Sequence, residues 1–417
     1  MQGPRPGGTG PVPGTGHGSA GRSVRGPSCR ERSYDLLRLV SGRPLLVGAA
    51  ETPYSRAQGE TTLSLLAQAA KSALDDAGLQ PARVDGLGVA SFSLAPDKAV
   101  DLAWRLGLSV RWLMDDASGG ASALNLLQHA CRAVEAGDAE TILLVAGDAL
   151  SPADFRRLAD EYSAAIRDHL APIPTGGPTA LFALLTRRHM RVHGLGRETY
   201  GRVVLAQRAW ARLNPWALFR EPLTMEDYLA APIVAHPLSL LDCVPIVAGA
   251  NALVLADRAS RRPAVEIAAL GASHNHDHQE GDGLRTGLAE IAPRLWEDAA
   301  LEPEEAAVFN VYDDYPVMVL VQLADLGLVP DGDLERFTRE RVETRQLPLN
   351  TSGGQLSAGQ AGAAGGMHGL VEAVRQLRGE AGERQVAGAA TAVVTGYGAV
   401  LYRYGASSNA AVLRRVD

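Results

Sequence analysis

The sequence has little cysteine and no recognisable metal-ligand spacing. Its 417 residues include three cysteines, Cys29, Cys131 and Cys243, and none of them stands in a CxxC or Cys/His pattern. So few thiols in so long a chain predict a reducing compartment, and we therefore expect a cytoplasmic protein without a metal site or other bound cofactor.

Long apolar runs and an excess of positive charge are also missing. No apolar stretch reaches the roughly 18 residues that a membrane-spanning helix needs, so no membrane span is expected. The net charge of −7 removes the general electrostatic case for binding nucleic acid. A hydrophobic content of 46% and a charged content of 21% are typical of a globular enzyme, and the length predicts two α/β halves of ordinary size.

The amino-terminal segment differs in composition from the rest of the chain. Residues 1–33 are rich in Gly, Pro, Ser and Arg, and they show no hydrophobic periodicity and no apolar core of the kind that a secretory signal needs. We expect a disordered extension there, with structure beginning around Asp35–Gly42.

A dense glycine cluster at Asn350–Leu370 stands out in the rest of the chain. The segment NTSGGQLSAGQAGAAGGMHGL contains seven glycines and runs into an amphipathic stretch at Val371–Arg378. Glycines let a backbone approach a ligand closely, and the start of a helix offers unsatisfied N–H groups, so an anion or oxyanion site is one interpretation. A close-packed helix crossing that merely needs small residues is the alternative.

The glycine cluster has an earlier counterpart, which indicates an internal duplication. Asp115–Leu124 (DDASGGASAL) precedes a helical stretch and the apolar strand TILLVAGD, and the later cluster precedes a helical stretch and the strand TAVVTGYG. Upstream, residues 74–91 match residues 296–313 as a helix end, a Leu-x-Pro turn and a strand. We therefore predict a first half at 34–260 and a second half at 261–417.

Periodicity places the first elements and a long insertion. A strand is expected at Pro44–Ala50 and a helix at Thr61–Ala77, which Gly78 should end. Residues 151–237 are too long for a simple crossover and carry their own helices, so we expect a separate lobe. The lobe leaves the sheet where α/β proteins bind ligands, which favours a substrate-covering role over a merely decorative one.

Five motifs in order resemble the thiolase superfamily. They are ASGGASAL, NPWALFREPLT, DCVPIVAGANALVLA, VYDDYPVMVLVQLADLGL and NTSGGQLSAGQAGAAGG, and together they span most of residues 44–405. Within the superfamily the chain is most similar to the sterol-carrier-protein and lipid-transfer-type branch. The resemblance implies a thiolase-like α/β fold, in which two duplicated halves form a layered α/β/α/β/α core with an inserted loop lobe.

The resemblance also implies which catalytic groups are missing. A working thiolase carries a nucleophilic Cys in its first loop, where this chain has Ala117, followed by Ser118, Gly119 and Gly120. Cys131 lies on the apolar side of the next helix, and Cys243 precedes a buried strand. We expect both thiols to belong to the core.

The remaining thiolase positions hold amides and phenols. Gln360 and Ala361 replace the His-Pro that follows Gly359, and Tyr312 stands before Asp313 where thiolases have Asn or His. Tyr397 and Gly398 stand near the late catalytic Cys-x-Gly. The aldolases of this branch have Tyr near both Tyr312 and Gln360. We expect Tyr312, Asp313, Gln360 and Tyr397 to be catalytic, and we expect a substrate or oxyanion loop made of Ala117, Ser118, Gly119, Gly353, Gly354, Gly359 and Gly398.

This inventory favours carbon–carbon cleavage without a covalent intermediate. A base would take a proton from a β-hydroxyl of an acyl-CoA, and loop donors would stabilise the thioester enolate. An acyltransferase and a non-catalytic acyl-CoA-binding or lipid-binding protein remain as alternatives. The resemblance further implies a homodimer, in which Ile142–Ala146 serves as the pairing strand, and a small OB-fold and zinc-ribbon partner protein.

Overall fold

The computed structural model describes residues 44–56, 59–170, 172–173, 177–259 and 263–417. The expected disordered extension at 1–33 and the expected start at Asp35–Gly42 lie outside these residues. Within the described ranges, no helix is long and apolar enough to cross a membrane.

Nine strands form one mixed sheet, and their order is β3-β2-β4-β7-β1-β8-β11-β10-β9. The two parts of the sheet meet at a short antiparallel contact, where Leu45 of β1 pairs with Glu266 of β8. The strands are β1 (Leu45–Glu51), β2 (Gly86–Ala90), β3 (Trp112–Asp116), β4 (Thr141–Asp148), β7 (Gly249–Ala256), β8 (Ala264–His274), β9 (Val308–Asn310), β10 (Thr391–Val400) and β11 (Gly405–Val416).

The strand order repeats, as an internal duplication predicts. In the first half, β1 pairs antiparallel with β7, β7 pairs antiparallel with β4, and β4 pairs parallel with β2. In the second half, β8, β11, β10 and β9 pair in the same order and in the same directions. The third strand of the first half is β3, which runs parallel to β2. Its counterpart in the second half is reduced to a single parallel bridge between Leu349 and Phe309.

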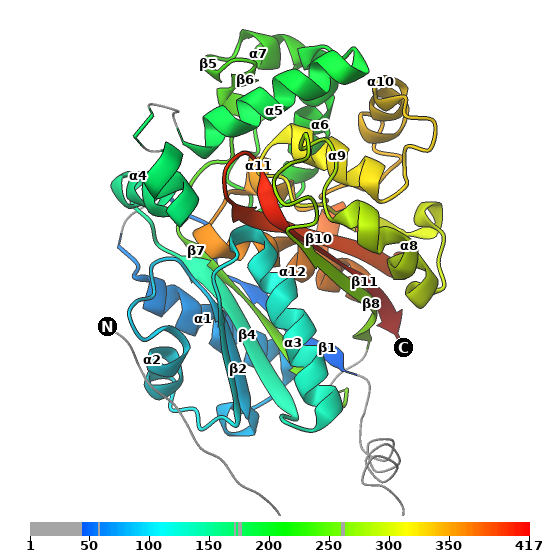
Figure 1. Cartoon of the computed structure of the whole chain (residues 1–417). Helices are drawn as coiled ribbons and strands as arrows, with labels where there is room; N and C mark the ends of the chain where they lie inside the picture. Colours follow the sequence, from blue (N-terminus) through cyan, green and yellow to red (C-terminus); the bar gives the residue numbers. More distant parts are fainter. Residues whose placement is uncertain (1–43, 57–58, 171, 174–176, 260–262) are drawn as a thin grey trace, which may run out of the picture. The chain divides into compact units, whose positions relative to one another are not determined.

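Helices complete the layers. In Figure 1, α3 (Ser122–Ala136) and α12 (Gly365–Arg378) lie at the centre; they contact each other, and each also contacts strands of both halves. The outer face of the first half is covered by α1 (Thr62–Ala77) and α2 (Lys98–Arg105), and α8 (Leu288–Ala299) covers the second, with α9 (Pro316–Asp325) packed against α8. This is the layered α/β/α/β/α arrangement expected from the sequence.

Local chemistry explains why the repeated helices end alike. The hydroxyl of Thr61 caps α1 by accepting from the Ser64 N–H, and Gly78 ends the helix in a left-handed conformation with φ 67°. At the matching position of the second half, Ala300 ends α8 with φ 49°. The predicted helix at Thr61–Ala77 and its Gly78 cap are confirmed.

Small residues allow the two central helices to meet. A Cβ atom placed on Gly366, near the start of α12, would lie 2.2 Å from the carbonyl oxygen of Gly120, just before α3. No side chain fits at that separation, so the backbone at the start of α12 packs directly against the backbone that precedes α3.

One expectation about local geometry is wrong, and one alternative is favoured over another. The stretch Ile142–Ala146 belongs to β4, which lies inside the sheet between β2 and β7, so it is no edge strand; the edge of the first half is β3. The glycine cluster is also less open than a ligand-binding loop would be. It contains α11 (Gly354–Ala358) and the start of α12, and almost all of its residues are buried. Close packing explains most of the cluster.

The insertion forms a lobe of helices, as its length predicted. It contains α4 (Pro152–Glu161), α5 (Pro178–His193), α6 (Arg197–Ala211), α7 (Met225–Ala230) and a hairpin of β5 (Ile233–Ala235) and β6 (Leu238–Ser239). Figure 1 shows these elements together in green, beside the end of the sheet where β4 leads into α4.

The crossing of the central helices can be tested with one methyl group. We expect Gly366→Ala to lower the free energy of unfolding by about 1–3 kcal/mol, because the new Cβ would overlap the Gly120 carbonyl. Gly271→Ala in β8 is the control, since its Cβ would meet Ile291 at an ordinary 3.4 Å. Urea unfolding of both variants measures the difference; equal midpoints would refute the close crossing.

Candidate active site

A mostly apolar cavity of about 300 Å³ lies between the lobe and the central loops. Four tyrosines contribute to its wall, and we call it the tyrosine cavity. Its lining includes Phe92, Gly119, Gly120, Phe155, Leu158, Tyr162, Thr179, Phe182, Cys243, Ile246, Tyr312, Asp314, Tyr315, Gln360, Tyr397 and Gly398. Residues of the lobe therefore form part of the wall of this cavity.

Tyr312 is held against the loop that precedes α3. A Cβ on Gly120 would lie 2.1 Å from the Tyr312 ring, so this ring position requires glycine at residue 120. The backbone of Tyr312 is fixed by an N–H donation to Thr395 Oγ1 at 3.0 Å and by an acceptance from Gln322 Nε2 at 2.7 Å. The side-chain amide of Gln360 donates to the Tyr312 hydroxyl at 3.2 Å. Tyr312 and Gln360, both predicted site residues, thus meet.

The phenols of the cavity resist ionisation. Burial raises the pKa of Tyr312 well above its usual value, and the nearby Asp314 carboxylate adds to the rise. Burial acts in the same direction on the pKa of Tyr315 and of Tyr397, and it raises the pKa of Tyr162 to about 12. All four phenols therefore keep their protons at neutral pH and can donate hydrogen bonds, but they are poor bases.

Asp313, expected to be catalytic, anchors a helix instead. Its Oδ1 accepts from the Gln355 N–H at 3.0 Å and its Oδ2 accepts from the Leu356 N–H at 3.2 Å, so both oxygens are engaged at the start of α11. Burial raises the pKa of Asp313 to about 7, although these hydrogen bonds oppose the rise. Asp313 is not part of the cavity wall.

The next carboxylate, Asp314, does line the cavity. Its Oδ1 accepts from the Tyr315 N–H at 2.9 Å. Burial, followed by the negative charge of Asp313, raises the pKa of Asp314 to about 8. The site residues expected from the sequence did not include it, since only the turn of the backbone decides which of two adjacent carboxylates faces a cavity.

Tyr397 and Gly398 also reach the cavity, but the Tyr397 hydroxyl has a structural partner. It accepts from the Gly405 N–H at 2.6 Å across the turn from β10 to β11. Gly398 lies against the first loop, because a Cβ there would meet the Ser118 carbonyl oxygen at 2.0 Å. The Ala399 N–H donates to the same carbonyl at 3.1 Å. The loop before α3 and the strand β10, which both contain expected site residues, therefore contact each other at Ser118.

Several of the expected loop residues lie elsewhere. Ala117 is exposed and Ser118 is half-buried, and neither lines the tyrosine cavity. The glycines of the late cluster serve packing. A Cβ on Gly353 would meet Ala211 of α6, one on Gly354 would meet the Asp313 carboxylate, and one on Gly359 would meet Val247. Of the expected loop, Gly119 and Gly398 are the members that reach the cavity.

The two described cysteines differ in position. Cys131 is buried in the core on α3, as expected, whereas Cys243 lines the cavity. Burial raises the pKa of each thiol to about 12. A thiolate is thus strongly disfavoured at both residues, which is the opposite of what a nucleophilic cysteine needs.

The lobe supplies residues that sequence reasoning missed. Tyr162 follows α4, and a Cβ on Gly119 would lie 2.4 Å from its hydroxyl. The Tyr315 hydroxyl lies 3.0 Å from Thr179 Oγ1, and its ring stacks on Phe182 with centroids 4.6 Å apart. Tyr315 directly follows the recognised VYDD motif, so its place in the sequence indicated a position near the site. The sequence around Tyr162 and Thr179 gave no such indication.

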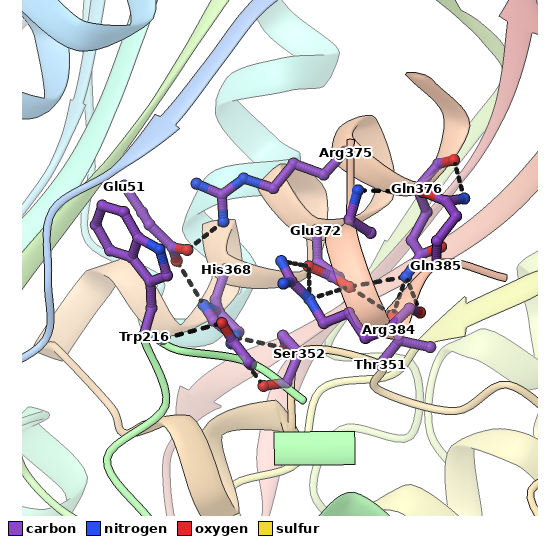
Figure 2. Close-up of polar contacts among 12 residues, drawn as sticks. Glu51, Trp216, Thr351, Ser352, His368, Glu372, Arg375, Gln376, Arg384 and Gln385 are labelled. Atoms are coloured by element: carbon purple, nitrogen blue, oxygen red, sulfur yellow. Dashed lines mark hydrogen bonds and ion pairs between the residues drawn. The ribbon is translucent and has the colours of Figure 1, made fainter. Parts of the chain in front are cut away.

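A buried ion pair supports the glycine cluster from the far side of α12. Arg384 Nη2 donates to Glu372 Oε2 at 2.9 Å, and Thr351 Oγ1 donates to Glu372 Oε1 at 2.7 Å. Gln376 Nε2 donates to the same Glu372 oxygen at 3.1 Å. Figure 2 shows these side chains converging beside the α12 ribbon, so the segment that leads into α11 is tied to α12.

A second network, also drawn in Figure 2, links the first half to the same segment. Glu51 of β1 forms an ion pair with Arg375 and lies 3.4 Å from His368 Nδ1, while His368 Nε2 lies 2.7 Å from Ser352 Oγ. Burial would raise the pKa of Glu51, yet Arg375 and His368 hold it well below its usual range. The glycine cluster is therefore held by buried charges of both halves.

An arginine-rich surface adjoins the site. The guanidinium groups of Arg56 and Arg208 lie 5.0 and 5.1 Å from the Phe219 ring centre. Arg212 and Arg220 line the same hollow of about 590 Å³ as Arg208 and Phe219. Arg56 also lines a neighbouring hollow of about 500 Å³, whose wall shares Ile246 with the tyrosine cavity. Across the described part of the chain, no His, Cys, Asp and Glu group could hold a metal ion.

Comparison with known proteins places this geometry in context. Residues 269–414 match the family model described as thiolase C-terminal domain-like. The chain is 34% identical to the 17-hydroxy-3-oxo-4-pregnene-20-carboxyl-CoA lyase of Mycobacterium tuberculosis, over 82% of this chain and 93% of that protein. It is 30% identical to a steroid side-chain-cleaving aldolase of Thermomonospora curvata, over 82% and 92% of the two chains.

A solved structure agrees with these relatives. The structure of the Ltp2-ChsH2(DUF35) aldolase superposes with a TM-score of 0.78 and 27% sequence identity, and the match covers 90% of this chain and 99% of that one. The thiolase-like fold expected from the sequence is confirmed.

The buried ion pair generates a stability prediction. We expect Arg384→Ala to lower the free energy of unfolding by about 3–5 kcal/mol, because it leaves the Glu372 carboxylate buried without its cation. Arg294→Ala is the control, since its ion pair with Asp298 is exposed and should matter little. Chemical denaturation compares the two; similar losses would show that Glu372 does not depend on Arg384.

Proposed function

Because the chain belongs to the thiolase superfamily, in the branch that includes steroid side-chain-cleaving aldolases, we propose that it is an acyl-CoA lyase. The proposed reaction is retro-aldol cleavage of a β-hydroxyacyl-CoA, in lipid or steroid catabolism. The observation that carries the proposal is the Tyr312 hydroxyl, which Gln360 holds in the wall of an apolar cavity where the Cys243 thiol is not activated.

Tyr312 suits the role of a hydrogen-bond donor to the thioester oxygen. Since its oxygen accepts from Gln360, its own proton can point toward a ligand, and its raised pKa keeps that proton in place. As the bond between the α- and β-carbons breaks, negative charge develops on the thioester oxygen as an enolate. A donor already in position stabilises that charge without reorganisation.

The arginine-rich hollow suits the other end of the substrate. Coenzyme A carries phosphates and an adenine ring, which guanidinium groups and the Phe219 ring can bind. The hollow that Arg56 lines shares Ile246 with the tyrosine cavity, and the Arg56 guanidinium also lies 5.0 Å from the Phe219 ring centre. We therefore place the nucleotide of the acyl-CoA near Phe219 and the acyl group in the tyrosine cavity; no further cofactor is proposed.

An acyltransferase is the second candidate, because Cys243 lines the cavity. Its hydrogen bond to the Ser239 carbonyl oxygen, 3.5 Å long, and its pKa of about 12 argue against a thiolate nucleophile. The two reactions differ in whether any cysteine is needed, which makes them separable by substitution.

The assembly is also a proposal. Among the described residues, the edge strand β3 has a partner on one side only. The exposed side chains Leu113, Val100 and Trp104 lie on β3 and on the adjacent α2. An unpaired edge with apolar neighbours favours pairing with a second copy. The name of the matched Ltp2-ChsH2(DUF35) aldolase includes a second component, which supports a partner protein here. We propose that this partner is the small OB-fold and zinc-ribbon protein implied by the resemblance of the sequence. A cytoplasmic location remains our expectation from the low cysteine content.

The reaction can be tested with the CoA ester named for the relative. Cleavage of 17-hydroxy-3-oxo-4-pregnene-20-carboxyl-CoA and of simpler β-hydroxyacyl-CoA esters should release a ketone and a shorter acyl-CoA. We expect Tyr312→Phe to lower kcat by about 100- to 1,000-fold, as the loss of one oxyanion donor does elsewhere. Tyr402→Phe is the matched control at an exposed phenol outside the cavity.

The same assay separates the two candidates. Replacing Cys131 and Cys243 by Ala should leave kcat within a few-fold of the unsubstituted enzyme. Loss of all activity in the Cys243→Ala variant, together with inactivation of the unsubstituted enzyme by iodoacetamide, would establish the acyltransferase instead.

The assembly can be tested on the tagged chain purified from its natural host. Light scattering should give at least twice the mass of one chain, with a small second subunit present. A Leu113→Lys variant should lower the mass by placing a charge on the β3 edge. A chain that is monomeric at micromolar concentration in both forms would refute the pairing.

A further inference from the structure

The retro-aldol reaction needs a group that accepts a proton, and the tyrosine cavity offers few. Its titratable residues among those described are four tyrosines, Cys243 and Asp314. No lysine, arginine or histidine is among the described residues that line it. The phenols and the thiol all have raised pKa values, so each keeps its proton near neutral pH.

Asp314 is clamped by the residues on either side of it. Asp313 is fixed by its two hydrogen bonds to the start of α11. Tyr315 is fixed by stacking on Phe182 and by its hydroxyl contact with Thr179. Both neighbours are anchored, and the Tyr315 N–H donates to Asp314 Oδ1 at 2.9 Å, which holds the carboxylate at the cavity wall.

Asp314 also lies among the four phenols. Burial raises the pKa of each of the four phenols, and the negative charge of Asp314 adds to the rise in every one. Asp314 and the four tyrosines line the same cavity, so a ligand held there lies against both the carboxylate and the phenols.

Resting on the proposed lyase function, we propose that Asp314 is the catalytic base that takes the β-hydroxyl proton of the substrate and returns it to the α-carbon. When the O–H proton moves to Asp314, a carbonyl forms at the β-carbon. The bond between the α- and β-carbons breaks, and its electron pair becomes the thioester enolate. Protonation of the α-carbon by Asp314 completes the acyl-CoA product. The proton is conserved, so no oxidant, reductant or further reactant is needed.

The environment of Asp314 sets the expected pH dependence. Burial and the charge of Asp313 raise its pKa to about 8, and a base must be ionised to act. Below pH 8 the ionised fraction falls tenfold per pH unit, so log(kcat/KM) should rise with unit slope and level off above about pH 8. Asp313→Asn removes a neighbouring negative charge and should move this rise toward lower pH.

The test compares Asp314→Asn with Asp314→Glu in the full chain. We expect Asp314→Asn to lower kcat by about 100- to 10,000-fold and to abolish the rise near pH 8, while binding of propionyl-CoA changes little. Asp314→Glu should restore part of the rate and a pH-dependent rise. Asp314 is only half-buried, so both variants should fold, and thermal unfolding verifies this.

A second readout isolates proton transfer to carbon. Incubated in deuterated water with propionyl-CoA alone, the unsubstituted enzyme should exchange the α-protons, and Asp314→Asn should exchange them at least 100-fold more slowly. If the unsubstituted enzyme cleaves β-hydroxyacyl-CoA esters, but Asp314→Asn keeps both the rate and the pH profile, the assignment of Asp314 is overturned while the lyase stands. If the unsubstituted enzyme cleaves none of them, both proposals fail.

Discussion

The absence of a side chain at Gly120 is the constraint on which the rest of the site depends. The Gly120 carbonyl faces Gly366 at the crossing of the central helices, and its Cα faces the Tyr312 ring and the Tyr397 carbonyl. At this one residue, the loop before α3 meets the start of α12, the segment that follows β9 and the strand β10. A Cβ on Gly120 would collide with the Tyr312 ring and the Tyr397 carbonyl, which both belong to the second half. The contact between the halves and the placement of Tyr312 therefore depend on the same residue.

Three carboxylates of the second half have different positions: two hold the structure together, and one faces the cavity. Glu372 is neutralised by Arg384 and holds Thr351, while Asp313 accepts two backbone N–H groups of α11. Because these hydrogen bonds engage both carboxylates, Glu372 and Asp313 hold the glycine cluster in place. Asp314 has an anchored backbone and a side chain at the cavity wall, and its pKa is raised to about 8 by burial and by Asp313. The negative charge of Asp313 therefore helps to raise the pKa of Asp314, the carboxyl group that faces the cavity.

The sequence predicted the fold well because its signals are local and repeated. The two SGG segments, the paired Leu-x-Pro turns and the Gly78 cap each correspond to an observed feature. Tyr312 and Gln360 could be paired because both stand at positions of recognised motifs.

The site was less predictable, since its composition depends on contacts distant in the chain. Tyr162 and Thr179 come from the lobe. No hydrophobic periodicity in the sequence indicates how the lobe packs on the central loops. Gly353, Gly354 and Gly359 suggested a ligand loop, yet Asp313, Ala211 and Val247 occupy the space that they open. The choice between Asp313 and Asp314 depends on one peptide turn, and Cys243 was expected in the core because a buried strand follows it.

The central claim is that carbon–carbon cleavage proceeds here without a covalent enzyme intermediate. Intact-protein mass spectrometry during turnover of a β-hydroxyacyl-CoA tests it most directly, with the reaction quenched in acid within milliseconds. Our account predicts that the protein keeps its unmodified mass at every time point while ketone and acyl-CoA accumulate. A transient acyl adduct that maps to Cys243 and forms as fast as product appears would contradict it.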